Sequence, residues 1–86
     1  SPGRVLPVHE QLGDMLMELG RPEEALEEYE TSLEHASQRF NSIYGAARAA
    51  RAAGKAEVAE AYYQQLLELA DPASPRPELA EARSVG

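Results

Sequence analysis

The chain carries one segment twice. Residues 20–36 read GRPEEALEEYETSLEHA, and residues 54–70 read GKAEVAEAYYQQLLELA. A shift of 34 residues superimposes identical residues at seven positions, which in the first copy are Gly20, Glu23, Ala25, Tyr29, Leu33, Glu34 and Ala36. A period of this length indicates a stack of similar supersecondary units.

Each copy predicts a hairpin of two helices around its glycine. Apolar residues recur at helical spacing before each glycine, and they are Leu12, Met15, Leu16 and Leu19 in the first copy and Ile43, Ala46, Ala47 and Ala50 in the second. Pro22 suits the first turn of a helix, because its missing N–H has no partner there. The β-branched apolar residues are too scattered for strands. We therefore expect an all-α chain with helices at residues 8–19, 22–36, 39–53 and 56–70.

The two ends of the chain have a different pattern. Residues 71–77 read DPASPRP, and three prolines in so short a stretch cannot continue a helix. Apolar residues return from Leu79 to Val85, which predicts a short capping helix over the second hairpin with Glu78 and Glu81 facing water. Residues 1–6 lack periodicity and predict a disordered or expression-derived N-terminus.

The two copies resemble the tetratricopeptide repeat (TPR). The spacing of that family's W-x2-L-G-x2-Y signature is occupied by His9, Leu12, Gly13 and Leu16, and in the second copy by Ile43, Ala46, Ala47 and Ala50. The family's A-x3-F is matched by Ala25 with Tyr29 and by Ala59 with Tyr63. The resemblance implies an α-solenoid of antiparallel helix hairpins in a right-handed superhelical stack. It divides the chain into repeats at 7–39 and 40–73, followed by a Pro-rich connector and capping helix at 74–86.

Composition narrows the classes of function. The chain has 86 residues, no cysteine and a net charge of -7. Phosphate backbones and anionic bilayers repel such a chain, so we expect no nucleic-acid and no membrane partner. The absence of cysteine removes thiolate metal sites and cysteine nucleophiles. No apolar run predicts a signal peptide or a membrane span, which favours a cytoplasmic location.

The two histidines, His9 and His35, each stand beside a glutamate. A metal site needs further convergent ligands, and acid–base catalysis needs a reacting group held against the base. The sequence offers neither. We assign both histidines structural roles and expect no metal, no cofactor and no enzymatic activity.

Charge is unevenly distributed along the chain. Residues 1–40 carry a net charge of -6 and residues 41–86 one of -1. The excess comes from an acidic run formed by Glu23, Glu24, Glu27, Glu28, Glu30 and Glu34. A solvated outer helix face is the simpler interpretation, and docking of a basic partner is the alternative.

The resemblance also implies a concave groove built by the first helix of each hairpin. It places on that groove Glu10, Asp14, Met17 and Glu18 from the first repeat and Asn41, Tyr44, Arg48 and Arg51 from the second. Arg48 and Arg51 lie one helical turn apart and are spaced to hold a carboxylate, with Tyr44 as an aromatic platform beside them. In the alternative interpretation, the two arginines pair with Asp14 and Glu18.

We therefore expect a protein–protein interaction module that binds a peptide or a protein segment in this groove. The alternative is a structural or self-associating segment of a longer TPR array, a homo-oligomer included, with no specific groove ligand. The sequence does not name the partner.

Overall fold

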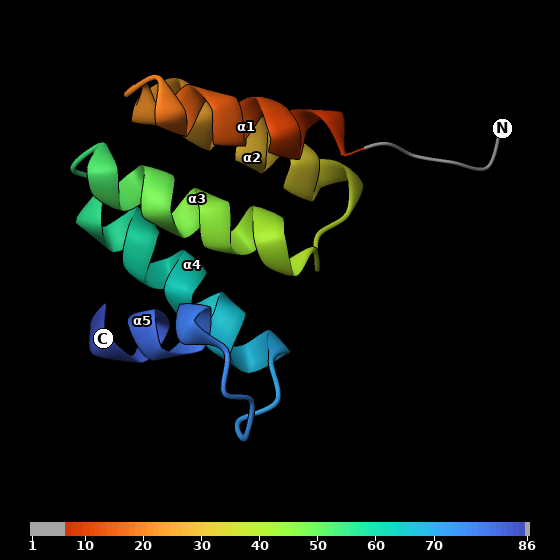
Figure 1. Cartoon of the computed structure of the whole chain (residues 1–86), viewed down its shortest axis with the longest axis vertical. Helices are drawn as coiled ribbons and strands as arrows, with labels where there is room; N and C mark the ends of the chain where they lie inside the picture. The colour runs from red at the N-terminus through yellow and green to blue at the C-terminus, as the bar shows by residue number, and fades with distance from the viewer. Residues whose placement is uncertain (1–6, 86) are drawn as a thin grey trace, which may run out of the picture.

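The computed structural model describes residues 7–85, so the predicted N-terminus at residues 1–6 lies outside the described residues. Within that range the helices are α1 (Val8–Glu18), α2 (Pro22–His35), α3 (Phe40–Ala52), α4 (Ala56–Leu69) and α5 (Pro77–Val85) (Figure 1). Residues 7–85 form no strand. The all-α prediction is confirmed, and the ends of the first four helices differ from the expected ones by at most one residue.

Both hairpins turn through a glycine in the left-handed region of backbone space. The φ angle is 74° at Gly20 and 80° at Gly54, values that residues with a Cβ rarely adopt. After each glycine the chain closes the preceding helix with the same bond: Arg21 N–H donates to the Leu16 carbonyl at 2.9 Å, and Lys55 N–H donates to the Ala50 carbonyl at 2.8 Å. The repeat in sequence is therefore a repeat in turn geometry.

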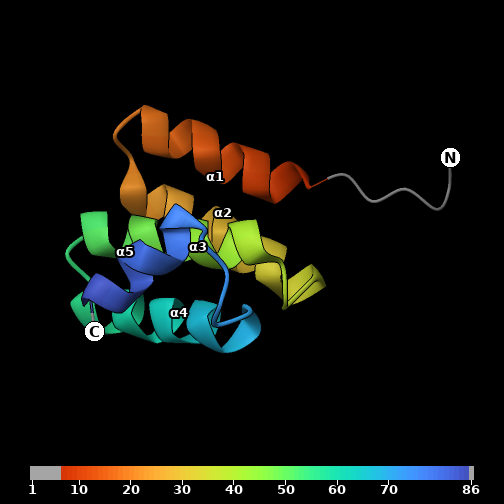
Figure 2. The ribbon, with the colours of Figure 1, turned by 60° about the horizontal axis from the view of Figure 1, so that its bottom comes forward.

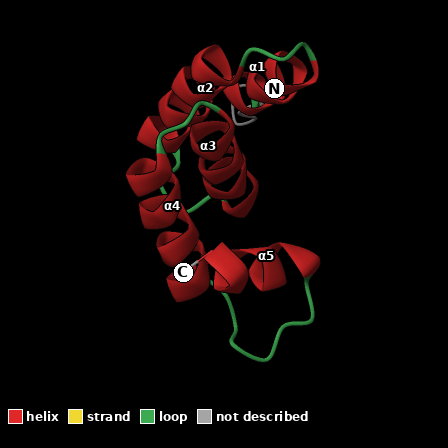
Figure 3. Ribbon diagram, turned by 90° about the vertical axis from the view of Figure 1, so that its left-hand side faces the viewer, coloured by secondary structure: helices red, strands yellow, loops and turns green. Residues whose placement is uncertain are grey.

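The helices pack in chain order into a curved stack. α1 pairs with α2 and α3 with α4, while α2 also packs on α3 and α5 packs on α4. Figure 3 shows α5 lying across α4 at one end of the stack, and Figure 2 shows α1 and α4 at opposite edges. Leu79 and Ala82 of α5 are only 1% and 2% exposed, so the C-terminal helix covers the last hairpin as its apolar pattern predicts.

One tyrosine and two glycines allow the two hairpins to pack closely against each other. Tyr29 of α2 is 2% exposed and enters between Gly13 of α1 and Gly45 of α3. A Cβ at Gly13 would lie 2.7 Å from the Tyr29 ring, and a Cβ at Gly45 would overlap the same ring. The absence of side chains at these two positions is what lets α1 and α3 close on the ring.

One apolar face of α1 points away from the stack. We call it the α1 stripe, and its residues are Val8 (47% exposed), Leu12 (37%), Met15 (49%) and Leu19 (61%). Of the apolar residues at helical spacing in this segment, Leu16 is the one that packs against the core. None of the helices in the described part of the chain combines the length and the apolar character needed to cross a lipid bilayer.

Candidate functional site

Two adjoining depressions run along the surface between α1, α3 and α5. The first has a volume of about 560 Å³ and is lined by Glu10, Asp14, Met17, Glu18, Tyr29, Asn41, Tyr44, Gly45, Arg48 and Glu78. The second has a volume of about 420 Å³ and is lined by Met17, Arg48, Arg51, Ala52, Tyr63 and Glu81. Because Met17 and Arg48 belong to both, we treat the two depressions as one groove.

The groove contains all the residues that the sequence singled out for it. Glu10, Asp14, Met17, Glu18, Asn41, Tyr44 and Arg48 line its first part, and Arg51 lines its second part. α5 was not expected here, and it contributes Glu78 and Glu81. The side chains differ in how open they are to a ligand. Asp14, Asn41, Arg48 and Arg51 are exposed, Met17 and Tyr44 are half-buried, and Glu10 is buried.

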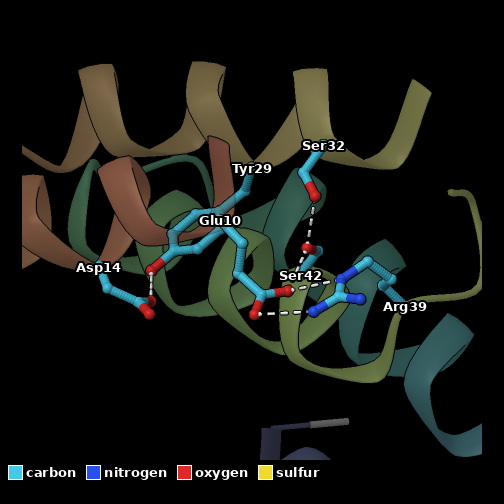
Figure 4. A network of polar contacts seen from close by, with 6 residues as sticks. All are labelled: Glu10, Asp14, Tyr29, Ser32, Arg39 and Ser42. Carbon is cyan, nitrogen blue, oxygen red and sulfur yellow. Dashed lines mark hydrogen bonds and ion pairs between the residues drawn. The ribbon is translucent and has the colours of Figure 1, made fainter. Parts of the chain in front are cut away.

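Glu10 is engaged within the fold (Figure 4). Arg39 donates to its two carboxylate oxygens at 3.0 Å and 3.1 Å, and the Ser42 hydroxyl donates to Oε1 at 2.7 Å. Ser42 also lies 2.7 Å from the Ser32 hydroxyl of α2. Burial raises the pKa of Glu10, but the bonds from Arg39 and Ser42 outweigh burial and hold the pKa below its ordinary value. This network joins α1, α2 and α3, and nothing in the local sequence indicates it.

Asp14 has one side-chain partner within the fold. The Tyr29 hydroxyl donates to Asp14 Oδ1 at 2.5 Å (Figure 4). Burial of the ring, together with this bond to a carboxylate, raises the pKa of Tyr29. Asp14 itself remains exposed. One carboxylate oxygen is therefore committed to the core tyrosine, while the side chain still faces the groove.

Glu81 of α5 lines the second part of the groove together with Arg48 and Arg51. It accepts hydrogen bonds from the Tyr44 hydroxyl at 2.8 Å and from the Tyr63 hydroxyl at 2.5 Å. Burial raises the pKa of Glu81, but these two bonds and the positive charges of Arg48 and Arg51 lower it further, so the net shift is downward. The expectation that Glu81 faces water was wrong, because α5 lies across the groove-facing side of the second hairpin.

The two groove arginines are not paired with the first repeat. Among the ion pairs of residues 7–85, none joins Arg48 or Arg51 to Asp14 or Glu18. The guanidinium of Arg48 instead lies 5.6 Å from the centre of the Tyr44 ring, within range of a cation–π contact. Tyr44 is thus already contacted by Arg48 and Glu81 and is not an open platform.

The histidines make contacts with neighbouring helices. His9 Nδ1 lies 2.7 Å from Glu28 Oε1 of α2, and the rings of His9 and His35 are stacked with centres 6.1 Å apart. Within the described range, no cluster of three or more histidine, aspartate or glutamate side chains is placed to hold a metal ion.

The comparisons with known proteins agree with the architecture. A family model described as tetratricopeptide repeat matches residues 4–71, which is more than half of the chain. A search of curated proteins found no match.

Proposed function

Because the chain belongs to the tetratricopeptide-repeat family, whose members are protein–protein interaction modules, we propose that it binds a segment of another protein in the groove between α1, α3 and α5. In this proposal residues 7–39 and 40–73 are the two repeats, and residues 74–86 are a Pro-rich connector and a short capping helix. The repeat is a non-enzymatic scaffold, so the proposed activity is binding and not catalysis.

One observation carries the proposal. Residues from both hairpins and from the C-terminal helix line a continuous groove whose two parts measure about 560 Å³ and 420 Å³. A long, shallow groove lined by several helices suits an extended peptide or a short helix, which makes contacts along its length.

The charges in the groove indicate the chemistry of the segment. Arg48 and Arg51 are exposed and can donate hydrogen bonds to a carboxylate. Asp14 and Glu18 are exposed on α1 and attract a basic residue. We therefore expect a ligand that carries both signs of charge, with its acidic residue on the α3 side.

Charge reversal of the two arginines tests the groove directly. Ligands would be selected from a random peptide library displayed against the wild-type chain alone, and then measured against the double variant Arg48→Glu, Arg51→Glu. We expect the selected peptides to bind the double variant at least about tenfold more weakly. The two substitutions remove charge-assisted hydrogen bonds to the ligand, and the free energy of one such bond is enough for a tenfold change in affinity. Fluorescence anisotropy measures the affinity.

Lys55→Glu is the matched control, because Lys55 is an exposed cation in the turn before α4 and lines neither part of the groove. It changes the net charge in the same direction and should leave the affinity nearly unchanged. Equal binding by the wild type and the double variant, or equal losses in the double variant and the control, would contradict the groove assignment.

Glu81 provides a second test of the same site. Its carboxylate lies close enough to the arginines for them to lower its pKa, so it competes with an acidic ligand for their charge. Glu81→Gln keeps an oxygen that accepts from Tyr44 and Tyr63 but removes the negative charge. Acidic peptides should bind this variant more tightly than the wild type, and weaker binding would argue that Glu81 organises the arginines instead.

The alternative function is self-association, and the exposed α1 stripe is the observation that favours it. Sedimentation velocity across a concentration series separates the two functions. A chain that stays monomeric at the highest concentration would exclude self-association as its purpose.

A further inference from the structure

The α1 stripe is a second candidate binding surface, distinct from the groove. Its members lie at i, i+4, i+7 and i+11, so they share one face of the helix. None of them lines the groove. They are Val8, Leu12, Met15 and Leu19, and they include the largest exposed fraction of any big apolar side chain in the described range, 61% at Leu19. A contiguous apolar stripe of this kind marks an interaction site more often than scattered single residues do.

The second repeat shows what such a face does. The shift of 34 residues carries the stripe onto α3 and the residue after it, at Ser42, Ala46, Ala49 and Ala53. The first three of these are 0% exposed. This face of α3 packs on the preceding hairpin, where Ser42 bonds to Ser32 of α2. In this architecture, the face that carries the stripe is a face on which another helix packs.

The opposite end of the stack is already closed. α5 covers α4 with Leu79 and Ala82, both almost completely buried. A second copy therefore cannot continue the stack by placing its α4 on the stripe of the first unless α5 is displaced. Among residues 7–85, the uncovered end of the stack is the α1 end.

Charge around the stripe identifies the kind of partner. Residues 7–35, which form the first hairpin, hold nine carboxylates and one arginine, a net charge of -8 with the histidines neutral. Glu18 is exposed one turn from Met15, whereas Glu24 of α2 is already paired with Arg21 at 2.5 Å. Two copies meeting through their stripes would bring two such hairpins together, and the repulsion between them opposes association.

We propose that the α1 stripe binds an amphipathic helix of a different protein, with an apolar stripe of its own flanked by lysine or arginine. The apolar side chains of that helix cover Leu12, Met15 and their neighbours, as α2 covers the equivalent face of α3. Its basic flanks meet the carboxylates of the first hairpin. This is the helix-in-groove type of recognition applied to an open helix face.

The test uses synthetic peptides of about 18 residues, roughly five helical turns. One carries leucine and alanine in a single stripe with lysine on both flanks. A second has the same composition with the stripe scrambled, and a third has glutamate in place of lysine. We expect the first peptide to bind the wild-type chain, the second and third to bind at least about tenfold more weakly, and raised salt to weaken binding because it screens the charges.

The double variant Leu12→Gln, Met15→Gln removes the stripe at positions that are already exposed, so circular dichroism should show an unchanged fold. We expect it to bind the first peptide at least about tenfold more weakly than the wild type does. Val58→Gln with Leu69→Gln is the matched control on α4, because these residues are 36% and 39% exposed. The control and the groove variant Arg48→Glu, Arg51→Glu should bind the peptide as the wild type does.

Four results would overturn the proposal. The first is equal binding of the striped and scrambled peptides. The second is unchanged binding by the Leu12→Gln, Met15→Gln variant. The third is a dimer in sedimentation that this variant abolishes, because the occupant would then be a second copy. Loss of peptide binding in the groove variant alone would place the peptide in the groove, which also overturns the stripe proposal while leaving the proposed function intact.

Discussion

The two ends of the stack differ in what covers them. At the C-terminal end, α5 packs on α4 and buries Leu79 to 1% exposure. At the N-terminal end, α1 carries the larger apolar side chains, yet Leu12 stays 37% exposed and Leu19 61% exposed. Each repeat buries two apolar faces against its neighbours. An apolar face that no neighbour covers therefore either binds a partner or lowers the stability and solubility of the chain. The burial of an apolar side chain in this protein therefore depends on its position in the stack and not on its hydrophobicity alone.

Truncation of Leu79 should have the largest effect on stability. Leu79→Ala removes a buried side chain at the closed end and should lower the free energy of unfolding by about 2–5 kcal/mol. The matched change at the open end, Leu12→Ala, should cost less, about 1–2 kcal/mol, since Leu12 is already 37% exposed. Urea unfolding followed by circular dichroism measures both. Similar losses would mean that the two ends are equivalently packed.

The second-largest effect on stability should come from a substitution at the contact between the two repeats. Gly45→Ala places a Cβ against the Tyr29 ring and should destabilise the chain by about 1–3 kcal/mol. The opposite sign is expected for an ordinary helical glycine, where alanine stabilises by about 0.5–1 kcal/mol. The sign of the change is therefore diagnostic.

Repeating Gly45→Ala in a Tyr29→Leu background supplies the control, because the smaller side chain leaves room for the Cβ. In that background the glycine substitution should be neutral or stabilising. A loss of the same size in both backgrounds would mean that Tyr29 is not the obstacle.

The ion pair of Glu10 and Arg39 should contribute less to the stability of the fold than the contact between Gly45 and Tyr29 does. The carboxylate is nearly buried, but the Arg39 side chain is 42% exposed, which weakens the attraction. Arg39→Gln should lower stability by about 1 kcal/mol at neutral pH. The pair ties α1 to α3 across the boundary of the repeats, so amide exchange should increase chiefly in α1. Uniform acceleration along the whole chain would contradict this local role.

The dependence of stability on pH should be the smallest effect. The pKa values of Glu10 and Glu81, one near each end of the stack, are lowered in the folded chain. Folding therefore favours their charged forms, and the stability they provide is present above the unfolded pKa of 4.5 and lost as pH falls through the lower folded values. Urea unfolding between pH 7 and pH 3 should show a shallower loss below about pH 4.5 in Glu10→Gln than in the wild type. Identical slopes would show that the carboxylate is not linked to folding.

Local patterns in the sequence predict most of the fold. The 34-residue period, the glycines before Arg21 and Lys55, and the prolines after Asp71 set where helices begin and end. These signals act through φ angles and backbone hydrogen bonds between residues close in the chain, so they can be read without tertiary information. The groove residues could also be placed together, since repeats of known spacing bring their first helices side by side.

The hydrogen-bond partners of those groove residues could not be predicted from the sequence. Glu10 is held by a partner 29 residues away, and Tyr44 by one 37 residues away. No short-range pattern encodes pairs so distant. The role of Glu81 depends on which side of the second hairpin α5 lies, which the connector at residues 71–77 does not specify by itself.

The sequence by itself determined that the chain forms helix hairpins of a repeating kind, because helical periodicity and turn chemistry are local properties. Only the tertiary structure decided which apolar faces are buried and which carboxylates remain free. Burial depends on whether a neighbour is present to cover a face, and the same helical pattern is a core at α3 and an open surface at α1.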